Sequence, residues 1–141
     1  MYNSRIINDS AMTDSDFTNV KAERACWMRS DLSGSDFRNS DIKRGLVEEC
    51  NLAGTNLAGV SAKQARLTKT DLSDANLQGM NMLFGSLRKS KLVRTDLRKA
   101  NLYGVEFYRT GVGDTKFDEA NLKMTKLHKR TDLIPGLKPK K

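Results

Sequence analysis

The side chains that could perform chemistry are sparse in this chain of 141 residues. His128 is the only histidine, and no obvious nucleophile stands beside it. Cys26 and Cys50 are the only cysteines, and they form no CxxC pair. A structural zinc site needs about four nitrogen or sulfur ligands, and nucleophilic catalysis needs a base next to the nucleophile. We therefore predict a non-catalytic protein with reduced thiols and with neither a metal nor a cofactor.

The charged side chains offer a different chemistry, the binding of anions. Lysine and arginine number 25 against 17 acidic residues, which gives a net charge of +8. Many of these cations recur at multiples of 20 positions, and with the cations that flank them they form a series that we call the basic stripe: Arg29, Arg66, Lys69, Arg88, Lys89, Arg109, Lys126 and Lys129. On one surface the stripe would attract nucleic acid or another polyanion, whereas its alternative role is to keep the protein soluble.

A five-residue repeat must position these side chains. Apolar residues follow one another at this interval from Met12 to Leu127, as at Leu32 and Phe37. A small or β-branched residue stands two positions before each of them, with Met80 as the bulky exception, and the residue between the two is often Asp or Asn. A period of five fits neither a helix nor a strand, so the chain must turn in every repeat.

The pattern assigns each position of the repeat to one side of a coil. We expect the large and the small residue to point inward and the other three to point outward. Asp and Asn suit the corners, because their side chains accept hydrogen bonds from nearby backbone groups and so support turns. The sequence therefore predicts an all-β solenoid with an apolar interior.

These features, with Ser-Asp-Leu, Ser-Asp-Phe and Ser-Asp-Ile in succession over 30–42, resemble the pentapeptide repeat family. The resemblance covers residues 10–129. It implies a right-handed quadrilateral β-helix with four pentads per coil and about six coils. We expect residues 1–9 to form an N-terminal cap, and residues 130–141 to form a C-terminal cap and a basic tail.

Four pentads per coil would place residues 20 apart on the same outer face. The faces centred on Leu32 and Phe37 then carry about −3 and −1, and those centred on Ile42 and Val47 carry about +4 and +5. The basic stripe lies on the Val47 face. Neighbouring coils are about 5 Å apart, within the roughly 8 Å screening length of physiological salt, so we expect mild repulsion along the stripe.

Large apolar residues should also meet on the outside of the last three coils. By the same spacing, the Ile42 face and its edge present Leu83, Phe84, Tyr103, Met124 and, just round the corner, Tyr108. Contiguous exposed apolar residues usually mark an interface with another protein. The alternative is that they cover a corner bulged by Met80.

The resemblance also bears on function. The best-understood family members protect bacterial DNA gyrase by imitating DNA with an acidic surface, and a chain of net charge +8 is a poor copy of a polyanion. The closing stretch from Ala100 through Thr115 resembles the end of pentapeptide-repeat modules encoded with type VI secretion systems. That resemblance implies an adaptor that loads or tethers a secreted component.

Our leading hypothesis is a scaffold or adaptor that binds another protein through the exposed apolar residues, with a homo-oligomer as an open possibility. The rival is a binder of nucleic acid or another anionic surface through the basic stripe. Against it, the stripe offers only Tyr108 for stacking on bases. No apolar stretch approaches the roughly 20 residues of a membrane span, so we expect a cytoplasmic protein without one.

Overall fold

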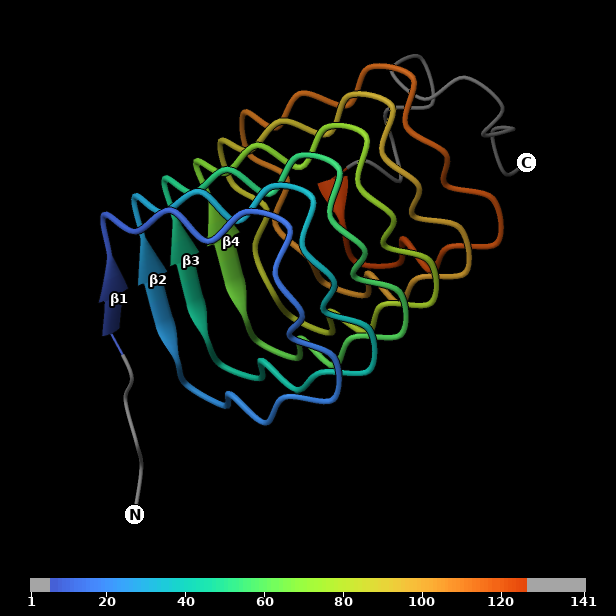
Figure 1. The fold of residues 1–141 in the computed structure, drawn as a ribbon. Coiled ribbons are helices and arrows are strands. Elements are labelled where there is room, and N and C mark those ends of the chain that lie inside the picture. The colour runs from blue at the N-terminus through green and yellow to red at the C-terminus, as the bar shows by residue number, and fades with distance from the viewer. Residues whose placement is uncertain (1–5, 127–141) are drawn as a thin grey trace, which may run out of the picture.

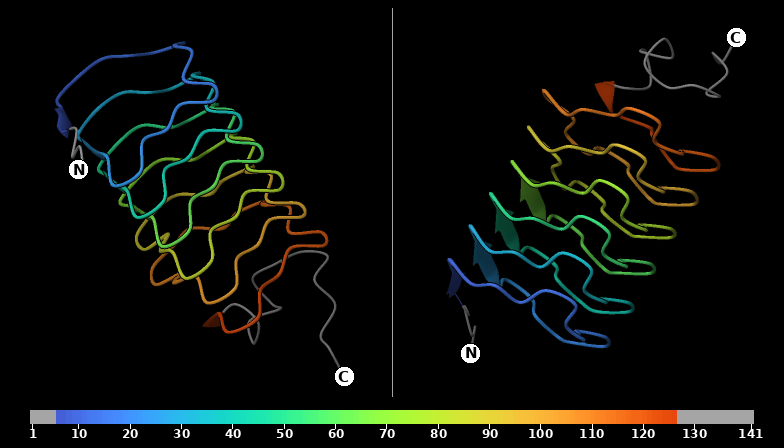
Figure 2. Two further views of the ribbon diagram at one scale, coloured as in Figure 1. Left: turned by 90° about the horizontal axis from the view of Figure 1, so that it is seen from below. Right: turned by 45° about the horizontal axis from the view of Figure 1, so that its top comes forward.

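The computed structural model describes residues 6–126. Over this range the chain winds into a right-handed coil of roughly square cross-section (Figure 1), and its coils stack into a rod (Figure 2). This is the predicted quadrilateral β-helix. The predictions for residues 1–5, for Leu127, His128 and Lys129, and for the C-terminal cap and basic tail at 130–141 lie outside the described residues.

Four short strands mark one side of the coil. They are β1 (Ile6–Asn8), β2 (Cys26–Met28), β3 (Leu46–Glu48) and β4 (Arg66–Thr68), and they form a parallel sheet in the order β1-β2-β3-β4. Each residue of β1, β2 and β3 pairs with the residue 20 positions later, and isolated parallel bridges with the same offset join the other three sides. The bridges continue through Ser86 and Glu106, so six coils of 20 residues stack over positions 6–125.

The ladder includes part of the segment that we expected to cap the N-terminus. Ile7 of β1 pairs with Trp27 of β2 and packs against the core. The backbone N–H of Asp9 then donates to the carbonyl oxygen of Met28 at 3.1 Å. The ladder needs only free backbone groups and one inward apolar side chain, which Ile7 supplies, so the described solenoid begins at Ile6.

A left-handed backbone conformation occurs once in every pentad. The second residue after each large one has a φ between 47° and 70° in all pentads from Asp9 to Met124, and only five of these residues are glycine. Other residues are disfavoured in this conformation by about 1–2 kcal/mol. Because this residue turns the chain, each side of the coil stays short, which explains why the sequence repeats every five residues. We call these the corner positions.

The Asp and Asn residues of the repeat support the corners as predicted. In each case a side-chain oxygen accepts a hydrogen bond of 2.9–3.3 Å from the backbone N–H two residues later. The residues that do so are Asp16, Asp31, Asp36, Asp41, Asn51, Asn56, Asp71, Asn76, Asn81, Asp96, Asn101 and Asn121.

The interior follows the predicted inward positions. From Ala25 to Phe107 every large and every small position is buried, and Leu72 has no exposed surface. Each fully buried leucine contributes about 1.5–3 kcal/mol to stability. Several buried hydroxyl groups donate to the backbone of the preceding coil, as Thr95 does to the carbonyl oxygen of Leu72 at 2.8 Å. Among the described residues, the hydroxyl groups of Ser40 and Ser73 and the indole N–H of Trp27 are buried without a hydrogen-bond partner. The core is therefore closed and mostly apolar.

The corner at Met80 is not bulged. The Met80 side chain is fully buried. The backbone ladder passes through it with ordinary geometry, since Asn81 N–H donates to the Val60 carbonyl at 3.0 Å and Asn101 N–H donates to the Met80 carbonyl at 2.8 Å. The exposed apolar residues nearby are thus not needed to cover an irregular corner.

Candidate interaction surfaces

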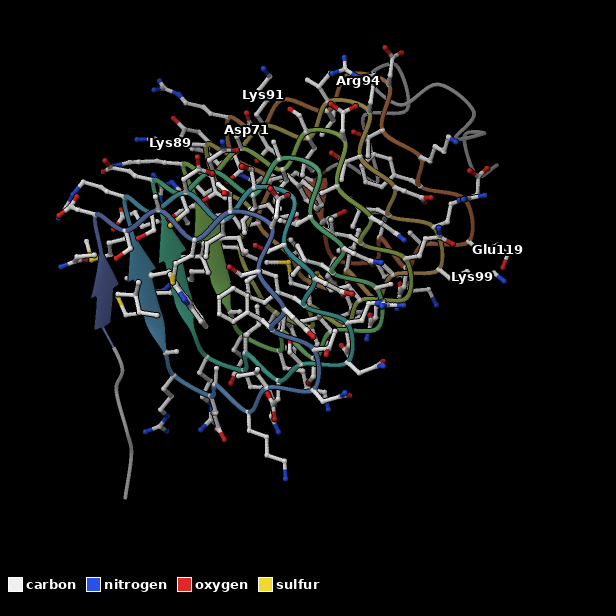
Figure 3. All side chains as sticks on the ribbon, viewed as in Figure 1. Asp71, Lys89, Lys91, Arg94, Lys99 and Glu119 are labelled. Carbon is white, nitrogen blue, oxygen red and sulfur yellow. The ribbon has the colours of Figure 1, made fainter. Side chains whose placement is uncertain are left out.

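Side chains at the outward positions project away from the coils, as the labelled Lys91, Arg94 and Lys99 show (Figure 3). The Ile42 face consists of the outward residues of 21–24, 41–44, 61–64, 81–84, 101–104 and 121–124, one segment from each coil. Its first three segments are rich in Lys and Arg, whereas 81–84 and 101–104 contain no charged residue. The chemistry of this face therefore changes along the axis of the rod.

Four residues form an exposed apolar patch on the last three coils of the Ile42 face. The rings of Phe84 and Tyr103 meet edge to face, with centroids 5.5 Å apart and planes at 87°. Phe84 is 56% exposed and Met124 is 74% exposed, while Leu83 and Tyr103 are half-buried. We call Leu83, Phe84, Tyr103 and Met124 the apolar patch.

Because residue 104 is glycine, the Phe84 ring can pack directly over the backbone. A Cβ atom at Gly104 would come within 2.5 Å of Cδ1 of the Phe84 ring, so the ring lies directly over this glycine. Gly104 also occupies a corner position with a φ of 69°. Its lack of a side chain thus serves both the turn and the contact between Phe84 and Tyr103.

The edge of the patch is polar and already hydrogen-bonded. Asn81, Asn101 and Asn121 stack one above another. The Asn101 side-chain amide donates to the Asn81 side-chain oxygen at 3.2 Å, and Asn121 donates to Asn101 at 3.4 Å. A partner on this face would therefore meet an apolar centre beside amides that are already hydrogen-bonded.

Tyr108, which we expected just round the corner from the patch, contacts cations of the basic stripe. The guanidinium carbons of Arg88 and Arg109 stand 5.0 Å and 5.2 Å from the centre of its ring. Such cation–π contacts are favourable by about 0.5–1 kcal/mol at exposed sites. Tyr108 therefore belongs with the basic stripe. The spacing of 20 between Arg88 and Tyr108 is the sequence signal that could have indicated this contact.

Acidic side chains interrupt the basic stripe and relieve the expected mutual repulsion at some of its cations. Arg29 Nε lies 2.9 Å from a carboxylate oxygen of Asp9, one coil away, and Lys69 Nζ lies 3.8 Å from both Glu48 and Glu49. The hydrogen bond from Arg29 holds the pKa of Asp9 below its usual value. Sequence counting found the cations but not these cross-coil pairs.

A groove of about 390 Å³ lies within the stripe. The groove is lined by four cations, two acids and three other residues, which are Arg66, Lys69, Arg88 and Lys89, Glu48 and Glu106, and Leu46, Thr68 and Ser86 respectively. Arg88 lies 3.9 Å from Glu106. The exposed Lys126 is not among the lining residues, and Lys129 is outside the described range.

The remaining reactive groups serve the coil. Cys50 is buried, its thiol donates to the carbonyl oxygens of Trp27 and Glu48 at 3.4 Å each, and burial raises the pKa of the thiol. Within residues 6–126, no three His, Cys, Asp or Glu side chains gather as metal ligands, and no helix is long and apolar enough to cross a membrane. A core void beside Trp27 measures only about 10 Å³, far below the roughly 300 Å³ of a ligand pocket.

A closed coil with an apolar interior and chemically distinct outer faces defines a β-helical solenoid. The family model for pentapeptide repeats matches the chain over residues 48–82 and 86–110, with eight copies. These two segments are similar to the pentapeptide repeat family, whose members are in general non-catalytic binding or structural proteins. In the structure, the same five-residue repeat continues before and after the matched segments.

Two solved structures share this fold. HetL, a pentapeptide repeat protein involved in heterocyst differentiation regulation in the cyanobacterium Nostoc, is 19% identical with a TM-score of 0.51; the match covers 87% of this chain and 62% of HetL, less than two thirds of that protein's length. Full-length QnrB1, a plasmid-mediated fluoroquinolone resistance protein, is 14% identical with a TM-score of 0.56, over 82% of this chain and 73% of QnrB1. No curated protein sequence matches the chain.

Proposed function

We propose that this protein is a non-catalytic adaptor that binds another protein through the apolar patch. The supporting observation is the exposure of two large apolar side chains, Phe84 and Met124, on the Ile42 face, whose segments 81–84 and 101–104 are uncharged and whose segment 121–124 adds the exposed Lys123 beside Met124. Exposed aromatic and Met side chains are enriched at the cores of protein interfaces. A partner that covered the patch would remove this apolar surface from water.

The coil itself does not require an aromatic residue at position 84. Phe84 occupies a corner position with a φ of 54°, and Lys89, Arg94 and Lys99 occupy equivalent positions in the next three pentads. Glycine or asparagine would suit this conformation better than phenylalanine. The presence of Phe84 is therefore better explained by an external contact than by the fold.

The test is the double substitution Phe84→Asn with Met124→Asn. Both residues are exposed corner residues with positive φ, which Asn tolerates well, so this gain should offset the lost contact between Phe84 and Tyr103 and the melting temperature should change little. Loss of an aromatic anchor often costs 2 kcal/mol or more, roughly a thirtyfold loss of affinity. Partner capture, measured by affinity purification with mass spectrometry after nuclease treatment, should be lost.

The matched control is Lys99→Asn, which changes a corner residue of similar φ on a different face. This variant should retain every partner. If the double variant also retains every partner of the parent protein, the apolar patch is not the interaction site.

A second candidate function is the binding of nucleic acid or another polyanion through the basic stripe. The observation in its favour is the groove, and in the described part of the chain Arg66, Lys89 and Arg109 have no carboxylate within 4.0 Å. Against it, the ring of Tyr108 is already engaged by two guanidinium groups. Failure to bind single-stranded or duplex nucleic acid in about 50 mM salt would reject this function, since phosphate contacts are strongest there.

Within the adaptor proposal, the resemblance of the C-terminal part favours loading or tethering of a type VI secretion component in a bacterial cytoplasm. Co-purification of such a component would support this role. Protection of a topoisomerase by DNA mimicry is disfavoured by the net charge of +8. Self-association through the patch is the remaining form of the proposal, and sedimentation of the parent beside the double variant would detect it.

A further inference from the structure

The Ile42 face is divided into two halves of different chemistry. The three coils nearest the N-terminus contribute mostly cations, with two acids among them: Lys21, Glu23, Arg24, Asp41, Lys43, Arg44 and Lys63. The next two coils contribute no charge and hold most of the apolar patch. A partner segment that runs along the axis of the rod would therefore meet both halves.

The cationic half keeps uncompensated charge. Asp41 is already occupied, because its carboxylate lies 3.2 Å from Lys43 Nζ. Arg44 Nε donates to Gln64 Oε1 at 3.0 Å, a neutral partner that orients the guanidinium group without cancelling its charge. Lys63 is exposed, and within the described residues no carboxylate lies within 4.0 Å of it. Arg44 and Lys63 are thus two oriented or accessible cations beside the patch.

We propose that the partner presents an acidic and apolar segment that lies along this face, with its carboxylates on Arg44 and Lys63 and its apolar anchor on Phe84 and Tyr103. This inference rests on the proposed function and names the chemistry of the partner. The charge complementarity follows from the excess of cations on coils 1–3. The apolar anchor follows from the uncharged, aromatic surface of coils 4 and 5.

The coil spacing sets the pattern of the segment. Arg44 and Phe84 are corner residues of the same face, two coils apart, and stacked strands are about 4.8 Å apart, so their backbones are separated by about 10 Å. An extended chain rises about 3.3 Å per residue. The partner should therefore carry Asp or Glu about three residues from an aromatic or large aliphatic residue.

A protein segment of this kind fits the face better than a second copy or a nucleic acid. A second copy would bring another face of net charge about +4, whose acids are Glu23 and the already paired Asp41. A nucleic acid would leave its phosphates without cations over residues 81–84 and 101–104. An acidic segment with an apolar anchor matches both halves.

The experiment selects phage-displayed random linear peptides on the immobilised full chain and then measures the affinity of the enriched peptides by fluorescence anisotropy. Two variants separate the two halves. Phe84→Asn with Met124→Asn removes the anchor site, and Arg44→Asn with Lys63→Gln removes two charges. Lys91→Gln with Lys99→Asn removes the same charge from the other faces and serves as the matched control. In each of the latter two variants, one substituted residue is a corner residue that Asn suits.

The enriched peptides should carry the predicted acidic and apolar spacing. The anchor variant should weaken their binding about thirtyfold. The charge variant should weaken it about fivefold at low salt and remove its salt dependence, as expected for exposed charge pairs, while the control leaves both unchanged. If the anchor variant weakens binding and the charge variant does not, the acidic segment is excluded while the proposed function stands. If no peptide is enriched, or if neither variant weakens binding, both the acidic segment and the proposed function are overturned.

Discussion

Two kinds of column run the length of the rod, and they differ in what they allow. The inward column through Leu32, Leu52, Leu72 and Leu92 holds closely similar side chains, all of them buried. The corner column of the Ile42 face holds Arg24, Arg44, Gln64, Phe84, Gly104 and Met124 on the same backbone geometry. Packing restricts the first column, and only a positive φ restricts the second. The inward residues therefore determine the fold, whereas the corner residues can vary and so can set binding specificity.

The largest expected effect is on the inward column. Leu72→Asp would bury an unpaired carboxylate among residues with no exposed surface, which costs several kcal/mol, so the protein should unfold or aggregate. A thermal melt followed by circular dichroism measures this. The matched change Lys63→Asp places the same new side chain at an exposed position and should cost less than about 0.5 kcal/mol. Similar melts for the two variants would contradict the difference between the columns.

A smaller loss of stability is expected when a glycine at a corner position is replaced. Gly79→Ala and Gly104→Ala impose similar backbone strain, since φ is 67° and 69°, but only the new Cβ at 104 meets the Phe84 ring. Gly79→Ala should therefore cost about 1–2 kcal/mol. Gly104→Ala should cost about 0.5–1.5 kcal/mol more, the value of the displaced contact between Phe84 and Tyr103. Equal losses in denaturant unfolding would show that this contact contributes nothing to stability.

The five-residue repeat predicted the inward positions well, because the repeat depends on burial alone. Ser30, Leu72 and Asn51 lie where the repeat places them, and the Asp and Asn residues make the expected turn bonds. The same spacing of 20 brought Phe84 and Tyr103 together. These features follow from chain periodicity, which a sequence displays directly.

The directions in which long outward side chains extend could not be predicted from the repeat. Periodicity gives the face on which a residue lies but not the direction that a flexible side chain takes along the rod. The spacing of 20 places Arg88 beside Tyr108 and Arg29 beside Asp9, but it does not show that these side chains turn toward each other, as they do in the structure. The half-burial of Tyr103 arises in the same way, from neighbours one coil away.

The smallest expected effect concerns outward carboxylates. Hydrogen bonds from Arg94 and Arg98 hold the pKa values of Asp74 and Asp96 below their usual value of 3.8. A carboxyl group whose pKa is lower when folded stabilises the fold above its ordinary pKa and loses that contribution as the pH falls through the folded pKa. The melting temperature should thus be level from about pH 7 to 5 and fall below about pH 4. Asp74→Asn should make that fall slightly shallower, and a fall between pH 7 and 5 would contradict this account.

The most direct test of the central claim places a photo-crosslinking benzoylphenylalanine at a single corner position of the purified protein. At position 84 it replaces a phenylalanine of similar shape, and at position 99 it occupies a corner of similar φ on another face. The account predicts that illumination in cell extract yields a discrete protein adduct from position 84 and none from position 99. Adducts of equal yield from both positions, or an adduct from position 99 alone, would show that the apolar patch is not where this solenoid meets its partner.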